Sequence, residues 1–356
     1  MFFKRFVFAA FTASTLAACA PTLQTHQVST EAMQAESLNQ MMFALQEEQN
    51  TTRRVFGIAL RVLSASAPLC DDAVVYDHSL LVRSKYSFEA GLKRNAAMQV
   101  FKVGEQPSVR VVFEGSPADQ AGIREGDTLI KVGTLDVGTG EAALKAVNNY
   151  LGNARKTKTP TPLSLVIARG DNVISTTITP APMCAYNFAV SPEGTVNAYA
   201  DGRNIVLHQG IIDLARNDDE IALVVGHELA HNVLDHISKK QANVLLGGLG
   251  GALLDAALGT GGQFSRLGQN IGSQAYSPSF ESEADYMGLY AVALAGYNHQ
   301  IAPQFWRRMG SRHQDSITLT TTHPATAERF VALESTVQEI NSKKAAGIPL
   351  KPNTRK

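Results

Sequence analysis

The segment His227-Glu228-Leu229-Ala230-His231 constrains the fold of this chain more than any other feature of the sequence. The spacing of Asn217 and Glu220 is typical of a helix capping box, and the apolar run from Ile221 to Leu234 contains no proline, so we predict a buried helix here. Side chains four residues apart on a helix project about 40° from one another, so both imidazoles face one space, which Glu228 borders. Two imidazoles suit zinc, and a nearby carboxylate that is not a ligand can take the proton of a metal-bound water.

A catalytic zinc site needs a third protein ligand, and a second helix downstream offers two acids. Ser277-Pro278 has the composition of a helix start, with serine at the cap and proline in the first turn, and Gly296 ends the helix. Glu281 and Asp285 are four residues apart and share one face, so one can bind the metal while the other orients a histidine. The alternative is an exposed acidic helix start that the helix dipole favours.

The first nineteen residues have the pattern of an export signal. Lys4 and Arg5 precede an uncharged apolar run from Phe6 to Ala13. The tetrapeptide Leu16-Ala17-Ala18-Cys19 resembles a bacterial lipobox, in which Cys19 is acylated and becomes the mature N-terminus; ordinary cleavage nearby is the alternative. The alanine after Cys19 is compatible with sorting to the outer membrane. We therefore predict an exported, lipid-anchored protein that faces the periplasm.

The cysteine count and the charge balance narrow the class of protein further. With Cys19 lipidated, Cys70 and Cys184 remain as a pair, and in an oxidising compartment we predict a disulfide; two buried free thiols are the alternative. Lys+Arg and Asp+Glu are both 32, so no basic surplus favours nucleic-acid binding. After the signal we find no run of about 18 uncharged apolar residues and predict no further membrane span.

The stretch from about 73 to 182 differs from the rest of the chain. It has β-branched runs separated by Gly, Pro and Asp turns, and one helical segment from Glu141 to Leu151. Within it, residues Gly115 to Gly133 resemble the central signature of bacterial PDZ domains, a short helix followed by a Gly-Asp turn and an apolar strand. The resemblance implies that peptide termini bind as an added strand. The alternative is a spacer or packing module.

Taken in order, the motifs after residue 190 resemble the HtpX-like metallopeptidases, gluzincins related to the CAAX endoproteases, and in particular their exported bacterial members. The resemblance covers about 192 to 335 and rests on Asn197–Gly202, Ile205–Leu214, the HExxH motif, Glu281–Asp285 and Thr322–Pro324. It implies one zinc ion per chain, bound by His227, His231 and Glu281. It also implies that Asp285 orients a histidine and that His323 faces the substrate and donates to the oxyanion.

Other residues near these motifs receive different interpretations. Arg329 is expected in a surface ion pair, with a role beside His323 as the alternative. His236 lies nine residues after His227, about 180° around a continuous helix, and is not expected to be a ligand. The strand Ile205–His208 is predicted to pair with an extended substrate backbone.

We therefore predict an α+β chain with a mainly helical gluzincin metallopeptidase domain, which contains a short β-hairpin or sheet, and an inserted or preceding β-rich PDZ-like domain. The expected segments are a signal peptide (1–18), a lipidated tether (19–30), an N-terminal helical segment (31–72), the PDZ-like domain (73–182), the zinc metallopeptidase domain (190–342) and a polar tail (343–356). The predicted function is a zinc-dependent endopeptidase that cleaves unfolded or misassembled cell-envelope proteins, with Glu228 as the general base. The alternative is a periplasmic chaperone or scaffold lipoprotein that binds polypeptides with latent or no proteolysis.

Overall fold

The computed structural model describes residues 26–258, 263, 278–312 and 327–354. The predicted signal peptide, the lipidation site Cys19, the helix cap Ser277 and the predicted substrate-facing His323 lie outside these residues. The described residues form a mixed α+β structure, and the predicted α+β class is confirmed at this level.

Helices dominate the two ends of the described chain, and strands lie between them. The α-helices are α1 (Thr30–Ala65), α2 (Leu92–Phe101), α3 (Pro117–Gln120), α4 (Gly140–Arg155), α5 (Gln209–Leu214), α6 (Asp218–Val233), α7 (His236–Leu258), α9 (Pro278–Leu294), α10 (Ala302–Arg312) and α11 (Ala327–Ala345). Short 3-10 helices are η1 (Ala67–Leu69), η2 (Lys85–Ser87) and η3 (His299–Ile301). The strands are β1 (Val74–Asp77), β2 (Leu81–Arg83), β3 (Ser108–Val111), β4 (Thr128–Val132), β5 (Leu135–Asp136), β6 (Leu163–Arg169), β7 (Asn172–Ile178), β8 (Ala181–Cys184), β9 (Asn187–Ser191), β10 (Ala198–Ala200) and β11 (Asn204–His208).

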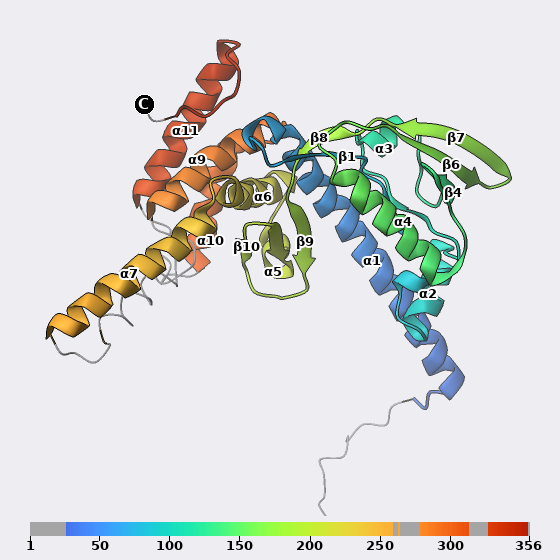
Figure 1. Cartoon of the computed structure of the whole chain (residues 1–356). Helices are drawn as coiled ribbons and strands as arrows, with labels where there is room; N and C mark the ends of the chain where they lie inside the picture. The colour runs from blue at the N-terminus through green and yellow to red at the C-terminus, as the bar shows by residue number, and fades with distance from the viewer. Residues whose placement is uncertain (1–25, 259–262, 264–277, 313–326, 355–356) are drawn as a thin grey trace, which may run out of the picture.

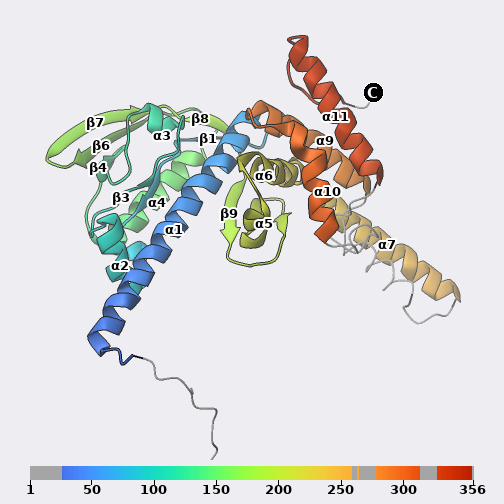
Figure 2. The ribbon, with the colours of Figure 1, turned by 180° about the vertical axis from the view of Figure 1, so that it is seen from behind.

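Helix α1 connects the two halves of the molecule (Figure 1). It begins at Ser29, whose side chain accepts a hydrogen bond from the Ala32 N–H at 3.1 Å, as an N-cap should. Leu45 in its first half packs in a small cluster with α2, whereas Val55 and Val62 are buried in the core of the helical half. This core includes α6 and α9, and the view from behind shows α10 and α11 on the same side (Figure 2). Helix α1 therefore contributes both to the core of the helical half and to the small cluster with α2.

The β-rich half contains an antiparallel sheet in the order β2-β3-β4-β6-β7, with β5 paired to β4. Strand β6 alternates between buried and outward side chains, and Leu163, Leu165 and Ile167 face the core. Val147 of α4 belongs to the same core, so α4 packs on this sheet.

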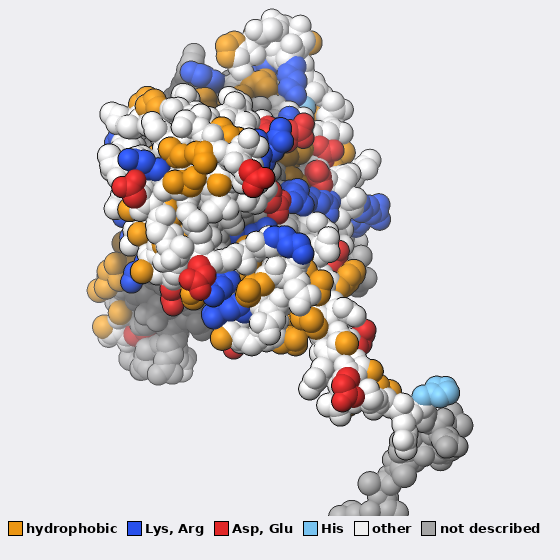
Figure 3. Space-filling view, turned by 90° about the vertical axis from the view of Figure 1, so that its right-hand side faces the viewer, with side chains coloured by type: hydrophobic (Ala, Val, Ile, Leu, Met, Phe, Trp, Pro, Cys, Tyr) orange, Lys and Arg blue, Asp and Glu red, His pale blue; other side chains and the backbone are white. Residues whose placement is uncertain are grey.

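On the face shown in Figure 3, acidic and basic side chains are interspersed and neither sign dominates.

A disulfide fastens the end of the α1 region to the β-rich half. Cys70 follows η1 and is bonded to Cys184 at the end of β8, with the two Cα atoms 5.7 Å apart. Val74 of β1 lies opposite Cys184 in the β1–β8 pair. The bond thus holds together the two segments at which the chain enters and leaves the β-rich half.

Helix α7 extends away from the rest of the molecule (Figure 1). It contains an apolar segment with several glycines at 244–254, and its exposed side chains include Leu245, Leu246, Leu249 and Leu253. Within the described part of the chain, we find no helix whose length and hydropathy would let it cross a bilayer.

Candidate metal centre

Helix α6 carries the complete HExxH motif. It begins at Asn217, whose side chain accepts a hydrogen bond from the Glu220 N–H at 3.0 Å and so satisfies one of the free donors of the first turn. Every residue from Glu220 to Asn232 is buried. The predicted buried helix is therefore confirmed, and its histidines lie in the interior of the protein.

A close helix crossing brings the motif next to α9. Gly226, directly before the first histidine, faces Gly288 of α9, and a Cβ atom added to Gly226 would lie 2.8 Å from the Gly288 carbonyl oxygen. A Cβ atom added to Gly288 would lie 3.0 Å from the backbone of both Gly226 and His227. These two glycines let the backbones approach closely, and this approach sets the distance between the acids of α9 and the imidazoles of α6.

Gly226→Ala tests whether this crossing is required. We expect a loss of about 1–3 kcal/mol in the free energy of unfolding, because backbone must move to admit the methyl group, together with weaker zinc binding. Urea denaturation and a zinc competition titration measure the two effects. Gly152→Ala in α4 is the control, since its Cβ would meet nothing within 4 Å and alanine favours the helix. If Gly226→Ala and Gly152→Ala had the same free energy of unfolding and the same zinc affinity, the close helix crossing would not be required.

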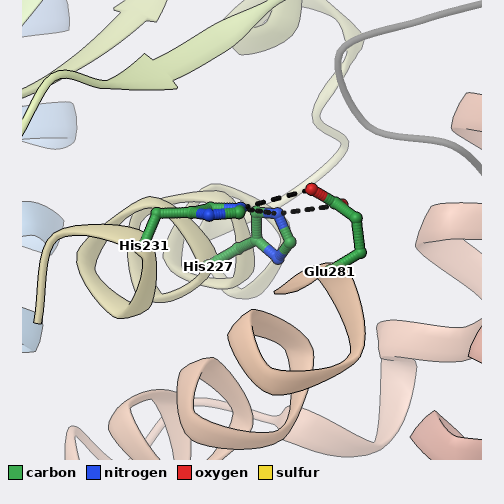
Figure 4. Close-up of side chains that lie close together, drawn as sticks. All are labelled: His227, His231 and Glu281. Atoms are coloured by element: carbon green, nitrogen blue, oxygen red, sulfur yellow. Dashed lines mark hydrogen bonds and ion pairs between the residues drawn. The ribbon is translucent and has the colours of Figure 1, made fainter. Parts of the chain in front are cut away.

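Three buried side chains converge where α6 and α9 meet (Figure 4). His227 Nε2 lies 3.1 Å from His231 Nε2 and 3.5 Å from Glu281 Oε2, and His231 Nε2 lies 3.4 Å from Glu281 Oε1. In a tetrahedral zinc site with bonds of about 2.0–2.1 Å, neighbouring ligand atoms are about 3.3–3.4 Å apart. The chemistry and the spacing of these donors therefore fit one zinc ion.

The carboxylate of Asp285 sets the orientation of His227. Its Oδ1 lies 3.0 Å from His227 Nδ1, so that nitrogen carries the proton and Nε2 presents its lone pair to the space shared with Glu281. Burial alone would lower the pKa of His227, but Asp285 and Glu281 outweigh it and raise the pKa to about 9. A proton and a metal ion thus compete for the same nitrogen.

Arg329 of α11 joins the two acids, and the expectation that it forms a surface ion pair is wrong. It is 3% exposed, and its Nη2 donates to Asp285 Oδ1 at 2.9 Å while its Nε donates to the other oxygen. Its Nη1 lies 2.9 Å from Glu281 Oε2. Burial alone would raise the pKa of Asp285, but the guanidinium holds it below its ordinary value. Burial alone would lower the pKa of Arg329, but both carboxylates outweigh it and raise the pKa.

Trp306 and Glu228 complete the buried surroundings. The Trp306 ring lies 5.1 Å from the ring of His227, and the Arg329 guanidinium lies 5.1 Å from the Trp306 ring centre. Glu228 is 2% exposed, so its carboxylate is shielded from bulk solvent in the interior of the protein.

The model for peptidase family M48 matches residues 166–337 of the chain, a segment that contains all these side chains. This M48 segment is just under half of the chain, and it is similar to that family. Because M48 peptidases are zinc-dependent, the similarity and the His-His-Glu group support the predicted enzyme class, a metallopeptidase.

Two relatives show how far the similarity of the M48 segment extends. The mitochondrial metalloendopeptidase OMA1 of Schizosaccharomyces pombe is 29% identical over 155 residues, which are 42% of this chain and 46% of that protein. The putative beta-barrel assembly-enhancing protease of Vibrio cholerae is 26% identical over 160 residues, 41% of this chain and 33% of that protein. The chain thus spans less than half the length of these relatives. The crystal structure of the HtrA3 PDZ domain bound to a phage-derived ligand matches 31% of this chain and 88% of its own at 20% identity. Its TM-score of 0.22 is too low to carry an argument.

One sequence expectation for the M48 segment must be corrected. Strand β11 (Asn204–His208) cannot offer an edge to a substrate backbone, because it lies between β10 and β9 and both its edges are paired. Among the described strands of this sheet, β10 lies at the edge beside β11. The strand Ala198–Ala200 is therefore the one of the hairpin that can accept an added backbone.

Proposed function

We propose that this chain is a zinc-dependent endopeptidase in which His227, His231 and Glu281 hold the metal. The observation that carries the proposal is the approach of three donor groups in a buried site. The two histidine Nε2 atoms are 3.1 Å apart, Glu281 Oε1 lies 3.4 Å from His231 Nε2, and Glu281 Oε2 lies 3.5 Å from His227 Nε2. When bound there, zinc would supply Lewis acidity, lowering the pKa of a bound water and polarising the scissile carbonyl.

In this proposal the surrounding side chains handle protons and orientation. Glu228 accepts the proton of the attacking water and returns it to the leaving amine. Asp285 keeps His227 in the tautomer whose Nε2 is free to bind a metal. Arg329 fixes both Asp285 and Glu281. His323 remains the proposed donor to the oxyanion.

We propose that the substrates are unfolded or misassembled proteins of the cell envelope. An extended backbone can pair with the edge of β10, which favours chains without stable structure of their own. Two relatives bear names that describe protease action in β-barrel assembly or in mitochondria. The export signal and the lipobox-like Cys19 support a lipid-anchored protein at the outer membrane, facing the periplasm.

We also propose that the β-rich segment at 73–182 is a PDZ-like domain that binds peptide termini. Strand β2 lies at the end of its sheet, so its outer edge can accept an added strand. The proposed order is then the tether at 19–30, the helical segment at 31–72, this domain, the peptidase domain at 190–342 and the polar tail at 343–356.

Metal removal tests the proposed function directly. Treating the purified full chain with 1,10-phenanthroline is expected to remove one zinc per chain and to reduce cleavage of unfolded casein to background, and added zinc should restore it. Trp306 is the single tryptophan of the chain and contacts His227, so its fluorescence should follow occupancy independently of activity. Trp306→Phe is the control for the optical signal. Cleavage that survives complete zinc loss would overturn the proposal, and a protein that never cleaves but suppresses casein aggregation would favour the chaperone alternative.

A further inference from the structure

The nitrogen of His231 that faces away from the three-residue site contacts another histidine. His231 Nε2 faces His227 and Glu281 (Figure 4), while its Nδ1 lies 3.0 Å from Nδ1 of His236. His236 is fully buried, and its Nε2 lies 3.2 Å from Oε2 of Glu283. Glu283 belongs to α9, and its side chain is 47% exposed. A chain of contacts thus runs from a partly exposed carboxylate to a predicted metal ligand.

The hydrogen-bond chemistry of imidazole determines which atom donates and which accepts in each of these contacts. A neutral imidazole has one N–H and one lone pair, and a nitrogen that binds a metal must present its lone pair. His231 then carries its proton on Nδ1 and donates it to Nδ1 of His236. The proton of His236 therefore lies on Nε2, where the carboxylate of Glu283 accepts it.

The backbone makes this contact possible by ending α6 early. The helix ends at Val233, and Asp235 adopts a positive φ of 53° before α7 begins at His236. This break turns His236 toward His231, whereas a continuous helix would direct it to the opposite side. The ring of Phe280 stacks on His236 at 4.5 Å with an angle of 16° between the planes. One turn of α9 therefore supplies the stacking ring and the acceptor, next to Glu281.

We propose that His236 is a positioning residue for His231, with Glu283 as the acceptor that fixes its tautomer. His231 then has an orienting partner in His236, as His227 has in Asp285, and α9 supplies the carboxylate in both cases. The inference rests on the proposed zinc site. It assigns His236 no contact with metal or substrate.

The test measures zinc affinity of the purified full chain by competition with a chromogenic chelator. His236→Phe keeps a ring against Phe280 but removes the acceptor, and we expect zinc affinity to fall about 10- to 100-fold. His236→Asn places an amide oxygen close to the position of Nδ1, so we expect it to recover most of the affinity. The absorption bands of the cobalt-loaded protein should change in His236→Phe and return toward wild type in His236→Asn. Glu283→Ala should shift both readouts in the same direction by less.

His78→Phe is the matched control. His78 is also buried, and its Nε2 lies 3.0 Å from the backbone carbonyl of Thr161 in the β-rich half. This variant should lose thermal stability without a change in zinc affinity. Should His236→Phe fail to fold, Glu283→Ala and His236→Asn carry the comparison.

The outcomes separate this inference from the proposed function. Wild-type affinity in a folded His236→Phe, or equal losses in His236→Phe and His236→Asn, would overturn the positioning role alone. Wild-type protein that binds zinc but cleaves no peptide would overturn the proposed function and leave the positioning role standing. Wild-type protein that binds no zinc would overturn both.

Discussion

Glu228→Gln is expected to reduce peptide hydrolysis about 10²- to 10⁴-fold, the range that a general base contributes. Glutamine has nearly the same shape as glutamate but cannot accept the proton of the attacking water. The three donor atoms of the candidate zinc site belong to His227, His231 and Glu281, so zinc content should stay at one per chain. The measurement is the rate of cleavage of unfolded casein, with zinc content determined on the same samples.

Two further observations make the Glu228 result decisive. Glu334→Gln is the control, because Glu334 lies on α11 in a half-exposed ion pair with Arg307 and should keep full activity. A Glu228→Gln protein that loses zinc would show only that the site had been disrupted. Equal cleavage by wild type and Glu228→Gln would refute the mechanism, and no cleavage by either protein would favour a polypeptide-binding scaffold.

The two helices of the candidate site could be predicted because their signals are local. The cap at Asn217 and the four-residue spacing of the histidines define α6 and its inner face, and the pair Glu281 and Asp285 does the same for α9. Periodicity gives the direction of a side chain around its own helix axis. The docking of α6 on α9, through Gly226 and Gly288, had no comparable local signal.

Three features that the sequence did not reveal depend on such docking or on a local break: the burial of Arg329, the orientation of His236 and the pairing of β11. Arg329 is 44 residues from Asp285 and reaches it only because α11 packs on α9. His236 was interpreted on a continuous helix, but Asp235 breaks the helix without glycine or proline, the residues that usually announce such a turn. Strand β11 was identified correctly as a strand, yet its pairing with β9 was not visible from the hairpin alone. For Arg329 and β11 the missing information is tertiary, and for His236 it is a local backbone conformation.

Arg329→Leu is expected to cost about 3–5 kcal/mol of unfolding free energy in metal-free protein, because it leaves two buried carboxylates without their counterion. Asp285 and Glu281 are 4% and 0% exposed, and Arg329 contacts both. In zinc-loaded protein the loss should be smaller, since the metal supplies positive charge beside Glu281. Urea denaturation of both forms measures the difference.

The comparison that identifies the cause is with Arg307→Leu and Arg329→Lys. Arg307 pairs with Glu334 where the two side chains are 52% and 51% exposed, so its loss should cost under about 1 kcal/mol. Lysine at 329 keeps the charge but lacks the planar fork that reaches both carboxylates, so its stability should lie between those of wild type and Arg329→Leu. If Arg329→Leu were no less stable than Arg307→Leu, the guanidinium would not be the counterion of the site, and the carboxylates would have to be protonated or paired elsewhere. Arg329→Lys could instead match wild type in stability but bind zinc more weakly. The positive charge would then be what stabilises the fold, and the planar guanidinium would be what places Glu281.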